Sequence, residues 1–429
     1  MVMVRGGRTA LMAGALAVAA VSAAAQTTPT APLRRLEFTQ AIEQALARHP
    51  SVAQAMEAVT QAEALLRQAR AATRPNLSTG LTNITLDAAR GFEGGITQPQ
   101  NQFAFTAAAD MPILAPALWA ARGQARDRVE VASRSVTEVR QQIAVAAAQT
   151  YLAVIAARRQ VEVGERALEN AQAHLSYADR RLEGGAGSRL NQLRAAQAVS
   201  ADEARLEAER LALIRAREAL GVIVVENGPV DAGAEPMLDV DGAVDESVWM
   251  SARPDIQVEQ HVRQAARREL DDSPKDWFPT GIVAFDPQYI APAGLFQPSR
   301  TWRLTFTVSQ PIFDGGARAS LKSLRRVSFR QAELSLSLAE IQARSEVRTA
   351  RASLASLERA LASARLSAEQ ADEVLVITTA AFEVGATTNI EVIDAQRSAR
   401  DADTLAALAE NAVRRAHLDL LVALGRFPG

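Results

Sequence analysis

The sequence predicts a mainly α fold with a small β part, built from two tandem strand-strand-helix-helix repeats. Mostly small apolar residues recur at alternating spacings of three and four between positions 343 and 382. This is the seam of a long helix that packs lengthwise on its neighbours. The same register occurs 200 positions earlier, and an alternating strand pattern recurs at an offset of 199. Two copies of one unit therefore follow each other along the chain.

The clearest strand lies at about 301–310 and has one apolar and one polar face. Trp302, Leu304, Phe306 and Val308 alternate with polar residues, which is the period of two of a β-strand. Its counterpart in the first copy is expected at about 102–111. Weaker strands precede the two clear ones, and Gly- and Pro-rich segments join the members of each pair. The weaker strands are predicted at about 77–86 and 280–286, and the loops at 91–101 and 287–300.

Two interpretations of these strands are open. Strands in soluble sheets also favour aromatic residues. However, eleven of the nineteen aromatic residues fall within 75–113 and 275–313, and interfacial aromatics with apolar-out, polar-in alternation are what an outer-membrane barrel requires. We therefore predict that Trp302, Leu304, Phe306 and Val308 face lipid. Four strands cannot close a barrel, since single-chain barrels begin at about eight strands, so several chains must share it.

Long helical hairpins follow each strand pair, at about 115–221 and 316–424. The first helix of each would extend on the order of 100 Å at about 1.5 Å per residue, far beyond a bilayer. The helices must therefore project away from the barrel. Gly185 and Gly385 lie in the turns of the two hairpins, where glycine can take the left-handed conformation of a helix C-terminal cap.

Each repeat is predicted to open with a broken helix. Pro50 interrupts the segment 36–73, and Pro254 lies at the equivalent place, 204 positions later. The segment 226–245 is rich in Gly, Pro and acidic residues and predicts a linker. The organisation expected from these features is a first repeat at 26–225, a linker at 226–245 and a second repeat at 246–429.

The first 25 residues have the pattern of a signal peptide. Arg5 and Arg8 precede an apolar run, and Ala23-Ala24-Ala25 offers a cleavage site. Without this segment the chain has 45 basic and 49 acidic residues, a net charge of −4, which predicts no nucleic-acid partner. The chain has no cysteine, so it offers no acceptor for an N-terminal lipid and is not expected to be a lipoprotein.

Three short motifs accompany the repeated plan. They are Leu36-Glu37-Phe38-Thr39-Gln40-Ala41-Ile42 through His49-Pro50-Ser51-Val52, then Gln310-Pro311-Ile312-Phe313-Asp314-Gly315-Gly316, then Phe382-Glu383-Val384-Gly385. Each is weak alone, but their order and the duplication make the match specific. From about residue 36 to the end, the chain resembles the TolC-type outer-membrane efflux proteins.

The resemblance implies a homotrimer in the bacterial outer membrane. Three sets of four strands would form one 12-stranded barrel, continuous with a periplasmic α-barrel of coiled-coil hairpins. Such channels need no cofactor. They pass substrates outward from an inner-membrane transporter of the RND, ABC or MFS type through a periplasmic adaptor, which would dock at the hairpin tips around Gly185 and Gly385.

The resemblance also suggests a periplasmic gate. Glu391 and Asp394 occupy the positions that narrow the tunnel entrance in related proteins, whereas Asn191 and Arg194 replace them in the first repeat. A simpler interpretation is open for both acids. Thr388 and Glu391 form a capping box, and Asp394 is a solvated acid near a helix start. Phe382 also stands where relatives often have tyrosine, and phenylalanine has no hydroxyl for the hydrogen-bonded latch of those relatives.

Neither catalysis nor a metal site is expected. His49, His174, His261 and His417 are scattered without metal-ligand spacing, and surface or helix-end placement would explain them. Two other functions compete with the export channel: a periplasmic adaptor and a structural periplasmic coiled coil. An adaptor would show one hairpin interrupting a β-rich module, and a coiled coil has no need for the strand alternation. The cargo leaves no residue signature.

Overall fold

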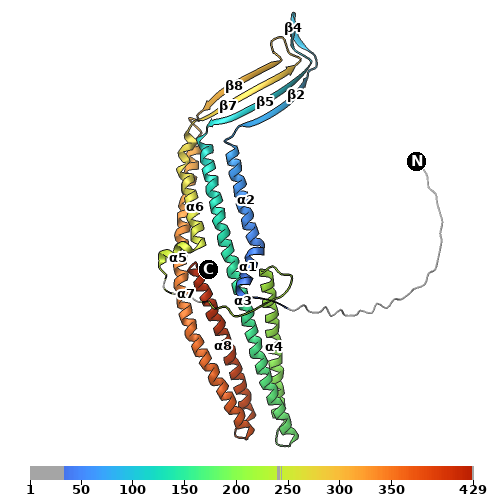
Figure 1. Cartoon of the computed structure of the whole chain (residues 1–429), viewed down its shortest axis with the longest axis vertical. Helices are drawn as coiled ribbons and strands as arrows, with labels where there is room; N and C mark the ends of the chain where they lie inside the picture. Colours follow the sequence, from blue (N-terminus) through green and yellow to red (C-terminus); the bar gives the residue numbers. More distant parts are fainter. Residues whose placement is uncertain (1–32, 239–241, 243, 428–429) are drawn as a thin grey trace, which may run out of the picture. The chain divides into compact units, whose positions relative to one another are not determined.

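The computed structural model describes residues 33–238, 242 and 244–427. The predicted signal peptide lies outside the described residues. From Arg34 onward, helices lead from a four-stranded sheet at one end to two helical hairpin tips at the other (Figure 1). None of the described helices is both long enough and apolar enough to cross a membrane.

The first repeat has the predicted helix, strand, strand, helix, helix order. Pro50 starts a new helix after a break at His49. A small β-hairpin, which the sequence did not reveal, lies in the first predicted loop. The elements are β1 (Arg34–Leu36), α1 (Phe38–Arg48), α2 (Pro50–Ala71), β2 (Asn76–Thr85), β3 (Arg90–Phe92), β4 (Gly95–Gln98), β5 (Asn101–Leu114), α3 (Pro116–Glu183) and α4 (Arg189–Ile223).

The second repeat follows the same order. Its opening helix breaks before Pro254, as the proline offset predicts. The elements are β6 (Val230–Ala232), α5 (Glu246–Ala252), α6 (Pro254–Asp271), a 3₁₀ helix (Ser273–Trp277), β7 (Thr280–Ala291), β8 (Arg300–Ser309), α7 (Ala317–Glu383) and α8 (Asn389–Ala423). Both long helices and both returning helices therefore lie where the sequence places them.

The sheet has the order β2-β5-β7-β8, and every neighbouring pair is antiparallel. Two expectations about strand ends are wrong. β5 does not end at about 111, as predicted, but continues to Leu114 past a bulge after Pro112. β7 runs through Pro287 to Ala291, into the predicted loop. Pro287 has no N–H to donate, and the register with β5 skips it, while on the other side it still lies opposite Trp302 of β8.

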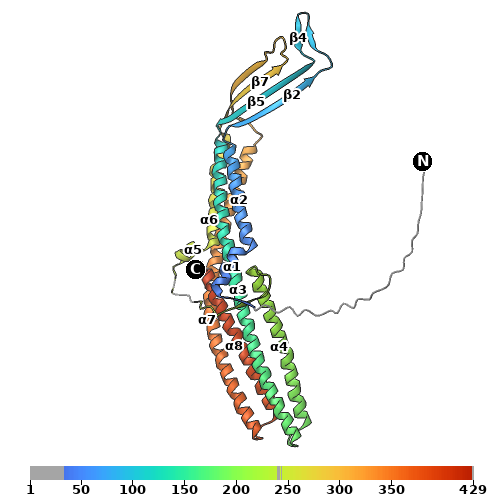
Figure 2. The same ribbon diagram turned by 45° about the vertical axis from the view of Figure 1, so that its right-hand side comes forward.

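The helices form two levels beneath the sheet. α3 and α7 run through both levels. α2 and α6 accompany them near the sheet, and α4 and α8 accompany them towards the tips, in both views (Figures 1 and 2). The strand order and the helix order agree, because α2, α3, α6 and α7 adjoin β2, β5, β7 and β8 respectively.

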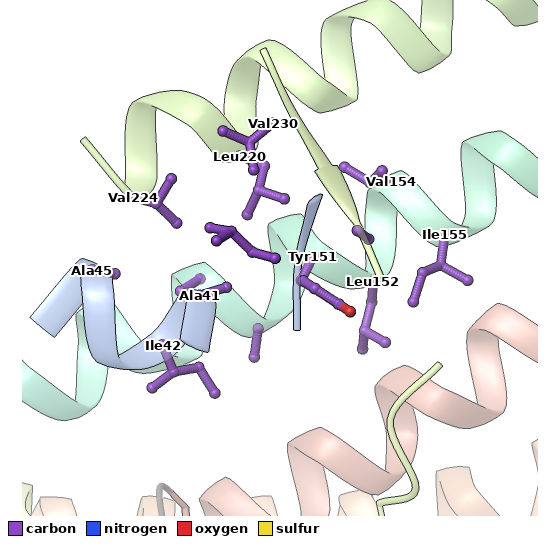
Figure 3. Close-up of a cluster of buried hydrophobic side chains, with 14 of the residues drawn as sticks. Ala41, Ile42, Ala45, Tyr151, Leu152, Val154, Ile155, Leu220, Val224 and Val230 are labelled. Atoms are coloured by element: carbon purple, nitrogen blue, oxygen red, sulfur yellow. The ribbon is translucent and has the colours of Figure 1, made fainter. Parts of the chain in front are cut away.

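The main core lies where the two levels meet. Tyr151, Leu152 and Ile155 of α3 are fully buried against α1 and the end of α4 (Figure 3). The Tyr151 hydroxyl donates to the Ala234 carbonyl at 2.8 Å. Burial, together with the nearby carboxylate of Glu37, raises the pKa of Tyr151 to about 12. The phenol therefore remains a neutral donor at physiological pH.

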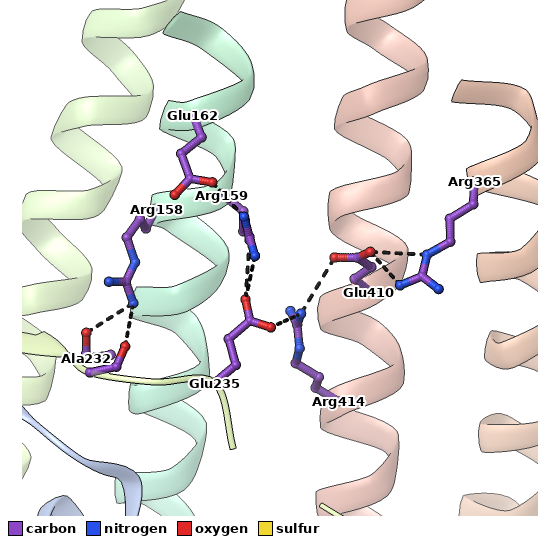
Figure 4. A network of polar contacts seen from close by, with 9 residues as sticks. Arg158, Arg159, Glu162, Ala232, Glu235, Arg365, Glu410 and Arg414 are labelled. Atoms are coloured by element: carbon purple, nitrogen blue, oxygen red, sulfur yellow. Dashed lines mark hydrogen bonds and ion pairs between the residues drawn. The ribbon is translucent and has the colours of Figure 1, made fainter. Parts of the chain in front are cut away.

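The segment predicted as a linker packs against both repeats. β6 pairs in parallel with β1, and the buried Asp231 accepts a hydrogen bond from Arg217 at 3.0 Å. Glu235 then reaches Arg159 of α3 at 3.1 Å and Arg414 of α8 at 2.7 Å (Figure 4). One carboxylate therefore joins the two hairpins. The predicted linker 226–245 therefore contains a strand that the sequence did not indicate, because a strand three residues long leaves too little pattern to be recognised.

Candidate functional site

One face of the sheet is apolar and exposed across all four strands. Trp302 is 72% exposed and Phe306 68% exposed. The register places them on the same face as apolar residues of the other three strands, since residues directly opposite in a sheet share a face. The exposed apolar residues of this face are Leu77, Leu81, Phe103, Phe105, Met111, Phe285, Tyr289, Trp302, Leu304, Phe306 and Val308.

The opposite face of the sheet is mainly polar. Arg303 and Asp286 lie opposite each other and form an ion pair at 3.5 Å. Thr305 and Thr307 of β8 share this face. The outer edges of β2 and β8 have no strand partner within the described residues. Exposed strand edges of this length have unpaired N–H and C=O groups that can pair with a strand of another chain.

The strand-to-helix junction after β8 is held by Asp314. Its carboxylate accepts hydrogen bonds from the backbone N–H groups of Gly316 and Arg318, both at 3.0 Å, and from the Arg318 side chain at 2.6 Å. Arg318 holds the pKa of this carboxyl below its ordinary value. The guanidinium of Arg318 in turn stacks over Trp277 at 4.2 Å. Asp314 therefore holds the Gly315-Gly316 turn and caps the start of α7.

Both hairpin tips end in the same left-handed glycine cap. Gly185 has a φ of 72° and Gly385 a φ of 80°. In each tip the following alanine N–H reaches back to a carbonyl five residues earlier, at 2.9 Å in the first hairpin and 2.8 Å in the second. This is the Schellman arrangement. Open space surrounds the position of a Cβ at either glycine, so backbone conformation rather than crowding favours glycine there.

The two tips also meet each other through a buried hydrogen bond. His174 Nε2 of α3 lies 2.8 Å from Asn389 Oδ1 of α8. The two residues are only 7% and 4% exposed, respectively. Burial lowers the pKa of His174, although the bond to Asn389 acts in the opposite direction. Phe382 packs against the rings of His174 and Tyr177, with centroids 5.4 and 5.5 Å away.

The expectation that His174 lies at the surface or at a helix end is therefore wrong. Its imidazole lies between the two hairpins because position 174 comes three residues after Ala171 and four before Ala178, on one buried face of α3. A histidine beside a helix seam was the signal available in the sequence. The partner, Asn389, comes from more than 200 positions away, and nothing in the local pattern identifies it.

The two gate candidates lie one turn apart near the start of α8. Glu391 accepts a hydrogen bond from the Thr388 backbone N–H at 3.1 Å, which confirms the capping box. Asp394 is exposed. A cleft between the tips is lined by other residues, among them Arg181, Asn191, Arg194 and Phe382. Within one chain, the structure brings neither acid into this cleft.

Among the described residues, no group of His, Asp and Glu side chains is arranged to hold a metal ion. The site therefore consists of surfaces: one face of a sheet, two strand edges and two hairpin tips.

Comparison with known proteins settles the family. The family model described as outer membrane efflux protein matches residues 41–224 and 249–426, which are the two repeats. The chain belongs to the outer membrane efflux protein family. The resemblance inferred from the sequence is thereby confirmed, and the localisation in the outer membrane with it.

Relatives within the family agree with this fold. Outer membrane protein OprJ of Pseudomonas aeruginosa is 29% identical over 264 residues, 58% of this chain and 54% of OprJ. The match thus spans about half the length of that relative. Among solved structures, a membrane protein from Pseudomonas aeruginosa has a TM-score of 0.80 at 21% identity, with 91% of each chain covered. The outer membrane protein VceC of Vibrio cholerae has a TM-score of 0.76 at 18% identity, covering 90% of this chain and 96% of VceC.

Proposed function

We propose that this outer membrane efflux protein is a homotrimeric export channel. The observation that supports this most is the sheet, with one exposed apolar face and two free edges. β2 and β8 run in opposite directions, so joining β8 of one copy to β2 of the next continues the antiparallel pattern. Three copies give about twelve strands, within the range of closed outer-membrane barrels. Trp302, Leu304, Phe306 and Val308 would then face lipid.

The helices support the same assembly. α7 exposes an apolar stripe along the side away from α6, made of Leu324, Val327, Leu334, Leu338 and Ile341. Contiguous apolar surface of this kind marks a contact with another protein. α2 lies at the other end of the layer, so a ring of copies would cover the stripe of each α7 with the neighbour's α2.

Substrates would enter at the hairpin tips. In this proposal an inner-membrane transporter of the RND, ABC or MFS type delivers them, and a periplasmic adaptor docks around Gly185 and Gly385. The channel conducts passively and performs no reaction. A periplasmic adaptor or a structural coiled coil, the two alternatives, would leave the exposed apolar face of the sheet without a role.

The gate proposal rests on the assembled ring. Three chains would place about six carboxylates from Glu391 and Asp394 at one mouth, where their repulsion favours bound cations. The Asp394→Asn, Glu391→Gln double variant should lower cation selectivity and weaken block by multivalent cations in single-channel recordings. Arg194→Asn, at the position of Asp394 in the first repeat, is the matched control and should change block less. Unchanged selectivity and block would leave both residues as helix-start acids.

Reconstitution tests the channel itself. The purified protein should migrate as a heat-sensitive trimer, require detergent for solubility and give discrete conductance steps in planar bilayers. A freely soluble monomer that produces no conductance would contradict the proposal.

A further inference from the structure

Four exposed cations form what we call the basic collar: Arg122 and Arg126 of α3 with Lys322 and Arg326 of α7. They lie roughly 8 to 15 Å below the helix starts at Pro116 and Ala317, at about 1.5 Å per residue. Helical side chains tilt towards the N-terminus, which here is the end that adjoins the sheet. The collar therefore lies at the level where a membrane-embedded sheet would leave the bilayer.

The collar has an unbalanced positive charge. The segments 114–130 and 309–330 contain eight basic and three acidic residues, in a chain that is acidic overall. Each of the three acids already has an arginine partner: Asp127 with Arg268, Glu130 with Arg134, and Asp314 with Arg318. For none of the four collar residues do the described ranges of the chain supply an ion-pair partner. Any group that pairs with these four side chains therefore comes from outside the described residues.

Exposed aromatic side chains lie beside these cations. Trp119 shares one exposed face of α3 with Arg122 and Arg126, at positions i, i+3 and i+7, while Asp127 and Arg128 make the contacts to α6. Phe313, in the loop that leads into the helix of Lys322, is 88% exposed. Tryptophan is enriched where a protein crosses a membrane–water interface. The combination fits a lipid surface better than a water-filled lumen, which has no use for exposed Trp and Phe.

We propose that the basic collar binds anionic phospholipid headgroups of the periplasmic leaflet. Lysine and arginine beside a membrane surface attract anionic lipids, and arginine pairs with phosphate through two parallel hydrogen bonds. Bound headgroups would fix the depth of the barrel, with Trp119 and Phe313 at the boundary between the headgroups and the acyl chains. The inference rests on the proposed position of the sheet in the membrane.

Native mass spectrometry of the full-length protein in mild detergent tests this. Phosphatidylglycerol and phosphatidylethanolamine with identical acyl chains are titrated in turn. The wild type should retain more phosphatidylglycerol. A variant changes Arg122, Arg126, Lys322 and Arg326 all to Gln. Its preference for phosphatidylglycerol over phosphatidylethanolamine should be at least about fivefold lower, which is the effect expected from the loss of one cation that binds a headgroup. Because the attraction is electrostatic, raising the NaCl concentration should reduce the preference of the wild type as well.

Two further variants make the test specific. The first is a control that changes four exposed arginines of the long helices to Gln: Arg140, Arg348, Arg351 and Arg359. These arginines form no ion pairs in the described structure, so the control should leave the lipid preference unchanged. The second changes Arg122, Arg126 and Arg326 to Lys. It conserves the positive charge, so it should retain most of the lipid preference. The proposal is overturned if the wild type shows no preference, or if the collar variant keeps it. Conductance measurements separate this inference from the proposed function. A wild type that conducts but shows no lipid preference refutes only lipid binding by the collar, whereas a wild type that does not conduct refutes the proposed channel.

Discussion

The helical hairpins of the two repeats share their helix lengths to within one residue and their glycine caps, but their long helices differ in what surrounds them. α3 packs against α1, α2, α4, α6 and α8, whereas α7 packs mainly against α6 and α8. As a result Leu152 of α3 is fully buried, while Leu338 of α7 is 55% exposed. The two long helices share one sequence pattern but have different surroundings: α3 lies at the centre of the chain, and α7 lies at its edge with an apolar side exposed.

The largest expected effect tests this difference directly. Leu152→Ala should destabilise the folded chain by about 2 to 5 kcal/mol, since it leaves a cavity in a closed core. Leu338→Ala should cost much less in the same denaturant titration followed by circular dichroism, but should lower the fraction of trimer on a native gel. Equal losses of stability in the two variants would show that α3 and α7 are not distinguished in this way.

The sheet is where the two repeats should behave alike. Phe105 and Leu304 are equivalent by the 199-residue offset and share the apolar face. Arg at either position should cost about 2 to 4 kcal/mol if the face lies mid-membrane, and assembly into heat-sensitive trimers should fall by a similar extent. Thr305→Arg, on the polar face, is the control and should be mild. If Thr305→Arg impairs assembly as much as Leu304→Arg does, β8 is not a membrane strand with this orientation.

The tips should also respond alike. Gly185→Val and Gly385→Val each place a β-branched residue in a left-handed conformation, at a cost of about 1 to 2 kcal/mol. Because the tips lie far from the sheet, trimers should persist while export with the cognate pump and adaptor is abolished. A variant that loses its trimers would indicate a folding defect and would remove the evidence for docking at that tip.

The smallest expected effect concerns the contact between the hairpins. The pKa of His174 is lower in the folded protein than its ordinary value of 6.5, so the unfolded state takes up the proton first as the pH falls. The stability contributed by this contact is therefore complete above about pH 6.5 and is lost as the pH falls from there towards the folded pKa. Amide hydrogen exchange at the tips should be faster at about pH 5.5 than at about pH 7.5.

A matched substitution separates this titration from general acid effects. His174→Gln retains an amide donor for Asn389 but does not titrate in this range. The variant should show slow exchange at the tips at both values of pH. A pH dependence that persists in His174→Gln would assign it to other groups.

Much of the fold follows from local pattern. The period of the seam, the offset between copies and the glycine turns define all four hairpin helices, and the alternation from Trp302 to Val308 defines the clearest strand. What the sequence did not reveal depends on distant partners. Pro287 is tolerated inside β7 because the register with β5 skips it, and β6 is a strand only because β1 lies beside it. The same holds at the candidate site, where the glycine caps were predicted but the bond between His174 and Asn389 was not.

The parallel pair β1–β6 has a consequence for biosynthesis. Arg34 pairs with Val230, so 196 residues separate the partners. Contacts between such distant residues form slowly, since the entropy of a large loop has to be lost first. During synthesis, the N-terminal strand has no partner until the ribosome has passed the first hairpin and begun the connecting segment. The first repeat therefore cannot complete its fold by itself. It requires β6, which is encoded just before the second repeat.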